Sequence, residues 1–225
     1  MKPSARLVLL LAPLLLVACH KKEPEAPAPA AVVVAAAPAP AAATPAAAEP
    51  ASQTPEQAEK AEKQARLDYS VMEDKYMTDP KAQWAATATA SSVYGDPKPD
   101  ENNLARHATG AIDDKQWVNN NQELGFDWIE LGYPKPVFAT EVRLVLHDGQ
   151  GVEALSKVEL QDTDGKWNTV WSGISDDKKD ERGVRTWFVR SFPKTAYKVK
   201  AVKYTIANNV KHGYKYVEAA QLVGE

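Results

Sequence analysis

Histidines, carboxylates and lysines are the residues of this chain whose types are suited to chemistry. His107, His147 and His212 could approach one another in a fold, but their spacing matches no metal-binding motif. The sequence contains no Gly-x-Ser-x-Gly elbow, no His-Glu-x-x-His pair and no glycine loop that would cradle phosphate. A carboxylate pair for glycoside hydrolysis stays open, because the separation of two carboxylates is a property of the folded chain. The residues therefore favour binding over catalysis, and we expect that the protein is not an enzyme.

A basic cluster stands out near the C-terminus, where six lysines fall within 22 residues. Residues two apart on a strand share a face, so Lys198 and Lys200 are expected on the same side. Clustered ammonium groups attract phosphate-rich partners, but an ordinary solvated strand face is the interpretation we prefer. The cluster consists of Lys194, Lys198, Lys200, Lys203, Lys211 and Lys215.

The only cysteine of the chain is Cys19, at the end of an apolar run that follows Lys2 and Arg6. A short basic start, an apolar core and small residues before a cleavage site are typical of a secretory signal peptide. We therefore predict a signal peptide over residues 1–18. A buried or redox-active cysteine is the alternative, and the position, spacing and uniqueness of Cys19 oppose it.

The segment Leu16-Val17-Ala18-Cys19 resembles the lipobox of bacterial lipoproteins. The resemblance implies that Cys19 becomes the lipidated first residue, with palmitate-like acyl chains that tether the protein to a membrane. Two or more chains anchor stably, whereas one holds only reversibly. His20 occupies the position where an aspartate usually signals retention in the inner membrane. The resemblance therefore implies the outer membrane of a Gram-negative cell, on either its periplasmic or its surface side.

Composition divides the rest of the chain. Without the leader, 25 basic residues face 30 acidic ones, and this acidic balance argues against a nucleic-acid partner. Residues 19–54 consist mostly of Ala and Pro, which favours an extended tether. This linker either provides reach across the envelope or is an unselected disordered spacer.

A helix is predicted over residues 55–79. Thr54 is a candidate N-cap, Pro55 suits the first helical position, and Asp79-Pro80 ends the segment. We expect this helix to pack on the following domain or to space it from the tether. Its apolar stripe is weak because it is rich in alanine, and it consists of Ala58, Ala61, Ala65, Met72 and Tyr76.

Strand patterns dominate residues 83–225. Val142, Leu144 and Leu146 alternate with other side chains, as Val158 and Leu160 do, which is typical of half-buried strands. Turn residues such as Asp148-Gly149 separate the runs. The pattern predicts an all-β domain, an antiparallel jelly-roll β-sandwich. Its further strands are expected at 127–132, 166–171, 184–190, 197–206 and 215–223.

Several fragments of this domain occur in a familiar order. The fragments are Ala88-Thr89-Ala90-Ser91-Ser92, Ala111-Ile112-Asp113, Trp128-Ile129-Glu130-Leu131-Gly132, Lys157-Val158-Glu159-Leu160 and Tyr216-Val217-Glu218. With these fragments the chain resembles a discoidin, or coagulation factor 5/8 type C, domain of the galactose-binding-like superfamily. The resemblance implies an eight-stranded jelly roll with binding loops at one end, which binds glycans, lipids or proteins and performs no chemistry.

The same resemblance implies a set of ligand-binding residues in these loops. Sugar recognition needs an aromatic face together with a few well-placed polar groups. Among the tryptophans, Trp117 is expected to be exposed, whereas Trp128 and Trp167 are expected in the core. The candidate binding residues are Tyr94, Arg106, His107, Trp117, His147, Asp148, Asn208, Asn209, His212 and Tyr214.

A structural calcium site is a further implication of the resemblance, because Asp113 and Glu218 match its two acidic positions. Calcium takes six to eight oxygens, and the shortened loop from Asp113 to Trp117 leaves too few identified donors. Alternatively, Asp113 caps a turn and Glu218 is a surface strand residue. No cofactor is required by any function considered below.

Two functions follow as expectations. The first is an envelope-anchored lipoprotein that displays a non-catalytic binding module, with peptidoglycan or a surface saccharide as its glycan. The second is a structural or accessory lipoprotein that docks an envelope protein partner, with the helix in the interface.

Overall fold

The computed structural model describes residues 54–225, which belong to one compact unit, Ala51–Glu225. Cys19, the signal peptide predicted at 1–18 and the linker predicted at 19–54, apart from Thr54, lie outside the described residues. No helix within 54–225 is long and apolar enough to cross a membrane.

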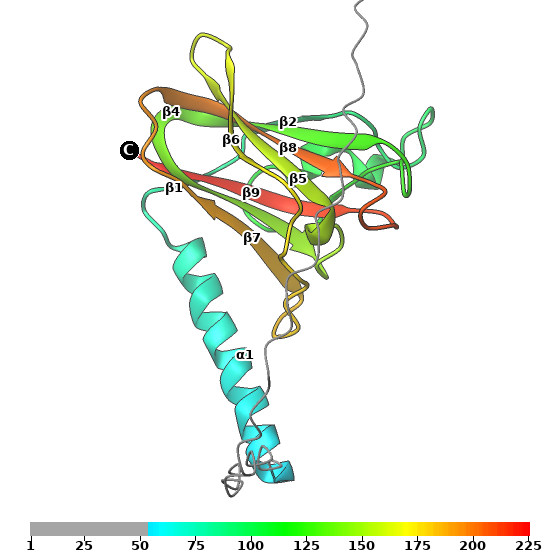
Figure 1. Cartoon of the computed structure of the whole chain (residues 1–225), viewed down its shortest axis with the longest axis vertical. Coiled ribbons are helices and arrows are strands. Elements are labelled where there is room, and N and C mark those ends of the chain that lie inside the picture. Colours follow the sequence, from blue (N-terminus) through cyan, green and yellow to red (C-terminus); the bar gives the residue numbers. More distant parts are fainter. Residues whose placement is uncertain (1–53) are drawn as a thin grey trace, which may run out of the picture. The chain divides into compact units, whose positions relative to one another are not determined.

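The predicted helix is present as α1, Pro55–Met77 (Figure 1). Thr54 forms a capping box: its hydroxyl accepts from the backbone N–H of Gln57 at 3.3 Å, and the Gln57 side chain accepts from the Thr54 N–H at 3.0 Å. Pro55 occupies the first turn, where its missing N–H costs nothing. The sequence signal for the helix start is therefore confirmed.

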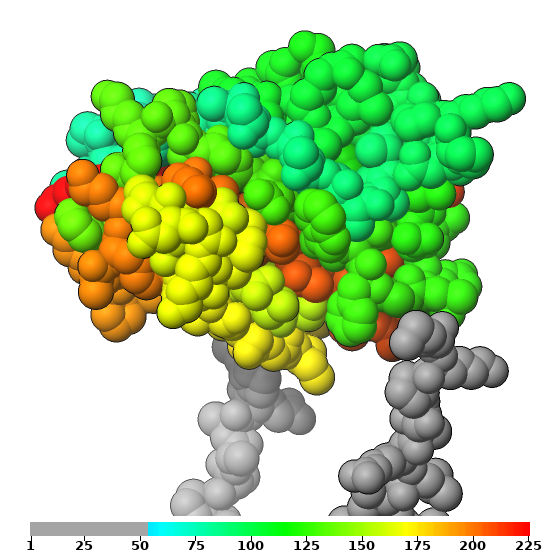
Figure 2. Space-filling view, turned by 90° about the horizontal axis from the view of Figure 1, so that it is seen from above, coloured from blue at the N-terminus to red at the C-terminus, as the bar shows by residue number. Residues whose placement is uncertain are grey.

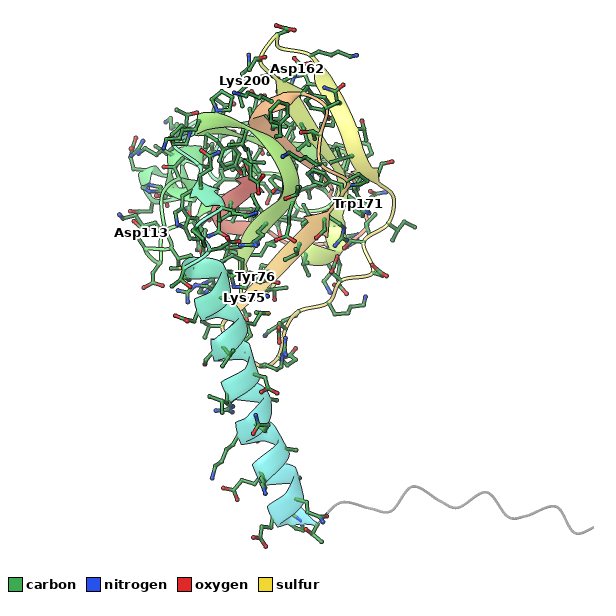
Figure 3. The ribbon with its side chains drawn as sticks, turned by 90° about the vertical axis from the view of Figure 1, so that its left-hand side faces the viewer. Lys75, Tyr76, Asp113, Asp162, Trp171 and Lys200 are labelled. Carbon is green, nitrogen blue, oxygen red and sulfur yellow. The ribbon has the colours of Figure 1, made fainter. Side chains whose placement is uncertain are left out.

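Only the C-terminal half of α1 contacts the strands. Tyr69 is buried, and its hydroxyl donates to the backbone carbonyl of Arg185 at 2.9 Å. Tyr76 packs on Trp187, with ring centroids 5.0 Å apart, and Figure 3 shows Tyr76 where α1 meets the strands. The predicted alanine stripe is wrong at its N-terminal end, where Ala58 and Ala61 are exposed, because no face of the helix is buried over residues 54–64.

The remaining chain forms two packed sheets in which every strand pair is antiparallel. Sheet I has the order β2–β4–β8–β5–β6, and sheet II has the order β1–β9–β4–β7, with β3 also paired to β9. The predicted jelly-roll sandwich is confirmed as the fold class. The strands are β1 (Ala82–Trp84), β2 (Thr87–Ala90), β3 (Trp117–Val118), β4 (Phe126–His147), β5 (Leu155–Asp162), β6 (Trp167–Ser172), β7 (Arg185–Ser191), β8 (Lys198–Ala207) and β9 (Tyr216–Gly224). Short 3-10 turns cover Glu101–Asn103, Ala105–Ala108 and Val152–Ala154.

Strand β4 belongs to both sheets. It is 22 residues long, and its register against β8 shifts between Gly132 and Val137, around Pro134 and Pro136. Proline has no N–H for the ladder, so this is where the strand can leave one sheet and enter the other. The sequence predicted two separate strands here, 127–132 and one around Val142, and the structure joins them.

The core lies between the sheets and is built from alternate residues of the central strands. Leu131, Leu160, Tyr204 and Leu222 are buried there with their neighbours. Burying a side chain of this size contributes about 1.5–3 kcal/mol. A smaller apolar cluster on the outer face of sheet II includes Trp187, and α1 covers it. This outer cluster explains why the helix docks where it does.

Candidate functional site

Three loops meet at one end of the sandwich around a single buried carboxylate, that of Asp127 near the start of β4. Oδ1 accepts from the hydroxyls of Ser91 at 2.7 Å and Ser92 at 2.8 Å. Oδ2 accepts from the amides of Asn119 at 2.9 Å and Asn208 at 3.1 Å. One side chain thus joins the segments around residues 91, 119 and 208, which we call the loop end.

Asp127 is ionised at neutral pH. Burial alone would raise the pKa of its carboxyl, but the hydrogen bonds from Ser91, Asn119, Ser92 and Asn208 outweigh it and hold the pKa below its usual range. A carboxylate with this many donors fixes the loops in one arrangement, since each loop would lose a charge-assisted hydrogen bond by moving.

Lys215 is a buried part of the loop end. Its side chain is fully buried, and its ammonium donates to the carbonyl oxygens of Gln122 at 3.1 Å and Gly213 at 2.5 Å. Its backbone N–H donates to the Asn119 side chain at 2.9 Å. Gly151 packs against it so closely that a Cβ would lie 2.4 Å from the lysine Cγ. Desolvation lowers the pKa of Lys215 to about 8, against the opposing charge of Asp127.

Lys215 makes the stability of the fold rise with pH in the alkaline range. Between about 8 and its ordinary pKa of 10.5, the unfolded chain binds the proton that the folded chain has released, so stability increases with pH. We expect the wild type to gain stability relative to Lys215→Met in this window. The difference between their free energies of unfolding should rise by up to about 1.4 kcal/mol per pH unit. Urea titrations from pH 7.5 to 10 check this. A difference that stays flat with pH would contradict the assignment.

The loop end held by Asp127 also carries a pair of aromatic residues. The rings of Tyr94 and Tyr214 meet edge to face with centroids 5.0 Å apart. The loop of Tyr94 is fixed by its N–H, which donates to the carbonyl of Val118 at 2.9 Å. Leu124, in the loop before β4, and Phe126, at the start of β4, are 80% and 66% exposed. Two predicted residues, Tyr94 and Tyr214, are therefore in contact.

A second group of predicted residues surrounds His147. Its Nδ1 lies 2.5 Å from a carboxylate oxygen of Glu218, which is buried and also accepts from Arg185 at 2.6 Å. His147 and Asp148 line a cavity of about 410 Å³ together with Gln116. The Asp148 carboxylate pairs with Lys179 at 2.6 Å.

Arg106 and His107 form a third group. The guanidinium of Arg106 pairs with the Glu101 carboxylate at 2.9 Å, and His107 Nε2 lies 2.8 Å from the Glu101 carbonyl. Both residues line a cavity of about 510 Å³ that shares Gln116 with the His147 cavity. The prediction placed all these side chains in one site, but the structure divides them between the tyrosine pair and two cavities that share Gln116.

Two predicted binding residues are wrong. Trp117 was expected to be exposed, but it is fully buried, and its indole N–H donates to the Ser92 carbonyl at 2.9 Å. Asn208 is also fully buried, as a donor to Asp127. Both hold the loops from within. Asn209 and His212 are exposed on the adjoining turn, as a ligand contact would require.

Asp113 and Glu218, the two residues suggested for calcium, are each paired with a basic side chain of the protein. Asp113 pairs with Lys115 at 2.8 Å, and Glu218 is held by Arg185 and His147. Within the described part of the chain, no group of three or more His, Cys, Asp or Glu side chains could hold a metal ion. The carboxylates are neutralised by cations of the protein itself, and Glu218 is buried and not a surface residue.

The lysine cluster is dispersed in the fold. Lys194 pairs with Glu225 at 3.3 Å, Lys203 with Glu130 at 3.4 Å, and Lys211 with Glu153 at 2.7 Å. Lys215 is buried. Four of the six lysines are therefore paired or buried, which favours the interpretation of an ordinary solvated surface.

The central residue of the loop end was missed. Asp127 sits one position from a strand start, and nothing in its local pattern distinguishes it from a turn residue. The run Asn119-Asn120-Asn121 was the available signal, since consecutive asparagines near a strand supply several side-chain amides. Trp128 and Trp167 were expected in the core, but both are only half-buried, on the outer face of sheet I.

Comparison with known proteins gives structural similarity only. No protein-family model matches the chain, and no curated protein matches its sequence. Among solved structures, CpGH89CBM32-5 from Clostridium perfringens, in complex with GalNAc-beta-1,3-galactose, is 17% identical, with a TM-score of 0.48 over 61% of this chain and 94% of that one. A family 32 CBM from C. perfringens NanJ, in complex with galactose, is 12% identical, with a TM-score of 0.48 over 63% and 98%. An F5/8 type C domain from Bacteroides fragilis is 14% identical, with a TM-score of 0.49 over 65% and 98%.

Proposed function

We propose that this chain is a non-catalytic binding module that recognises glycan through its loop end. The observation that carries the proposal is the tyrosine pair, Tyr94 and Tyr214, on loops held by the buried Asp127 carboxylate. Because the loops are already ordered, a ligand has little ordering entropy to offset on binding.

The chemistry of this surface suits a sugar. An aromatic ring stacks on the C–H face of a pyranose, while nearby polar groups bind its hydroxyls. Arg106, His107 and Gln116 supply donors and acceptors in one neighbouring hollow, and His147 supplies them in the other. The ligand we propose is peptidoglycan or a cell-surface saccharide.

Binding should depend on the tyrosines. We expect Tyr94→Ala and Tyr214→Ala each to weaken glycan binding about tenfold, since truncating a central aromatic contact typically costs 1–2 kcal/mol or more. A glycan array and a peptidoglycan pull-down with the purified protein identify the ligand, and calorimetry then measures Kd. Ile174→Ala, at an exposed position in the loop after β6, is the matched control. Equal binding by the tyrosine variants and this control would exclude the loop end.

We also propose that Cys19 carries a lipid and places the module in the outer membrane. The support is the sequence Leu16-Val17-Ala18-Cys19 after an apolar run. Labelling of cells with a palmitate analogue should mark the wild type but not Cys19→Ser. Fractionation of the membranes then tests the location.

A second function, docking of an envelope protein partner, is favoured by one feature of α1. Leu67 and Val71 are 57% and 62% exposed, and residues four apart share a helix face. Crosslinking in cells from this face should capture a stoichiometric protein if this function holds. If no stoichiometric protein is recovered, the docking function is contradicted and only the glycan proposal is left.

A further inference from the structure

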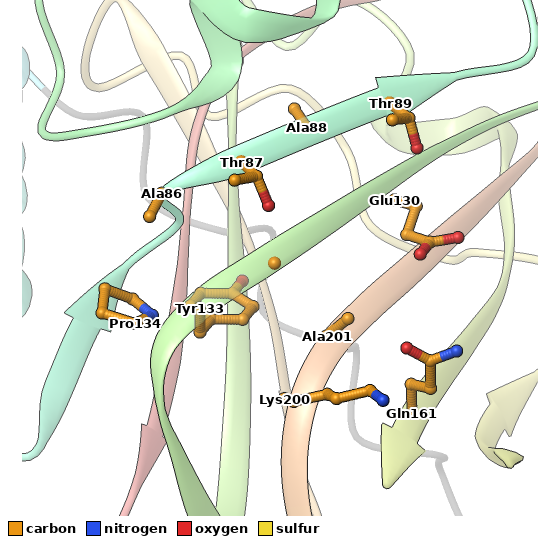
Figure 4. Close-up of a pocket in the computed structure, with 11 residues that line it drawn as sticks. Ala86, Thr87, Ala88, Thr89, Glu130, Tyr133, Pro134, Gln161, Lys200 and Ala201 are labelled. Carbon is orange, nitrogen blue, oxygen red and sulfur yellow. The ribbon is translucent and has the colours of Figure 1, made fainter. Parts of the chain in front are cut away.

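The outer face of sheet I carries a groove away from the loop end. Its floor is formed by β4 and β8, where Gly132 pairs with Ala201, and its sides by β2 and β5. The cavity measures about 450 Å³, and Figure 4 shows Thr87 and Thr89 on one side with Gln161 and Lys200 on the other. Figure 2 shows the same arrangement in space-filling form, with β8 visible between β2 and the yellow β5–β6 hairpin.

Small residues create this hollow. Gly132 has no side chain, and a Cβ there would lie 2.4 Å from the Thr87 hydroxyl oxygen. Ala201 adds only a methyl group opposite. Larger residues at this cross-strand pair would fill the floor, so the depth of the groove is a direct result of the sequence.

Two tryptophans are fixed on this same face. The ammonium of Lys203, on β8, lies 4.3 Å from the centroid of the Trp167 ring and 4.9 Å from that of Trp128. A cation at these distances is attracted to both ring faces, which holds the indoles in place. Both tryptophans are half-buried. Trp167 is the cross-strand partner of Gln161, which lines the groove.

The charges on this face nearly cancel. Lys203 pairs with Glu130 at 3.4 Å, and Lys157 pairs with Glu159 at 3.0 Å. Lys200 is the remaining charge, and its ammonium donates to the Thr163 carbonyl at 3.3 Å. With three lysines against two glutamates, the groove has no strong field to collect a polyanion. Its threonine hydroxyls, amide and carboxylate are also too polar for a lipid tail.

We infer that this groove binds a neutral saccharide chain, whose pyranose faces stack on Trp128 and Trp167 while its hydroxyls bind Thr87, Thr89, Glu130 and Gln161. Fixed aromatic rings beside hydroxyl and amide groups are the combination that a neutral polyhydroxylated ligand requires. The groove is a second site, separate from the loop end and independent of whether the loop end binds glycan.

The test uses the full-length protein labelled with ¹⁵N. Cellohexaose, mannohexaose and chitohexaose are the neutral probes, and a hexagalacturonate is the anionic one. We expect a neutral hexamer to shift the indole N–H signals of Trp128 and Trp167. Trp128→Ala and Trp167→Ala should each raise its Kd about tenfold or more, while Ile174→Ala leaves it unchanged. Circular dichroism verifies the fold of each variant, and the wild-type indole shifts do not depend on any variant.

The outcomes separate the two sites. Indole shifts that persist in Tyr94→Ala and Tyr214→Ala support the groove even if the loop end fails. Binding that is lost in the tyrosine variants, with no shift at Trp128 or Trp167, overturns the groove and leaves the loop-end proposal standing. Shifts caused only by the hexagalacturonate, or by no probe at millimolar concentration, overturn the inference of a neutral saccharide.

Discussion

Asp127→Ala should lower the free energy of unfolding by about 3–5 kcal/mol, the range seen when one partner of a buried charged network is removed. The alanine leaves the hydroxyls of Ser91 and Ser92 and the amides of Asn119 and Asn208 without their common acceptor. The amides of Asn119 and Asn208 are fully buried and lose a charged acceptor that water cannot replace there, so the effect exceeds that of a single lost hydrogen bond. Urea denaturation monitored by tryptophan fluorescence gives the magnitude.

The same variant should lose glycan binding at the loop end, because three loops are released together. Asp176→Ala is the matched control, since Asp176 is exposed and a surface substitution usually changes stability by less than about 0.5 kcal/mol. If the two variants had equal stability, Asp127 would not be the residue that holds the loops.

The pKa of the Asp127 carboxyl is lowered in the fold, so its contribution to stability is present above its ordinary pKa of 3.8 and is lost as the pH falls through the lowered value.

Local patterns in the sequence were sufficient to predict most of the fold. The capping residues Thr54 and Gln57 mark the helix start, and alternation of apolar residues marks β5 and the inner half of β4. Strand β2 is short and has the sequence Thr-Ala-Thr-Ala, which lacks large apolar residues to alternate. Strand β3 has only two residues. Such strands exist because they pair with β4 and β9, and pairing between distant segments leaves little local signal.

The candidate site was harder to predict for a related reason. Tyr94 and Tyr214 were chosen from the resemblance and do meet, but Trp117 and Asn208 face inward. Type and loop position do not determine the direction of a side chain, which here is set by the bonds to Ser92 and Asp127. The prediction for Trp128 and Trp167 is wrong in the opposite sense, because they were expected in the core and lie on the outer face of sheet I. Period two shows which residues of one strand share a face, but not whether that face meets the core or lies on the outside of the sheet.

Arg143→Met should detach the C-terminal end of α1 from sheet II and lower the free energy of unfolding by about 3–5 kcal/mol, as expected for a broken buried ion pair. The guanidinium is buried and donates to Glu141 at 2.6 Å, Asp79 at 2.8 Å and Gln221 at 3.0 Å. It also lies 4.4 Å from the centroid of the Tyr76 ring. One side chain thus connects β4 and β9 to the end of the helix, and methionine keeps its volume without its charge.

Hydrogen exchange locates this effect. We expect faster exchange at the amides near Tyr76 in Arg143→Met, with little change in β5. Arg182→Met is the matched control: its partner is Asp180 at 2.7 Å, but the pair is partly exposed and its loss should cost less than about 1 kcal/mol. Equal losses in the two variants would show that burial adds nothing to the Arg143 contacts.

The pH dependence provides an independent check on Arg143. Burial tends to raise the pKa of the Asp79 carboxyl, but the Lys81 N–H and the Arg143 guanidinium outweigh this and hold it below its ordinary value of 3.8. A lowered carboxyl pKa stabilises the fold above the ordinary value, and this contribution disappears as the pH falls through the lowered one. The stability difference between wild type and Arg143→Met should therefore be full at pH 7 and shrink below about pH 4, whereas lost packing alone would leave it unchanged with pH.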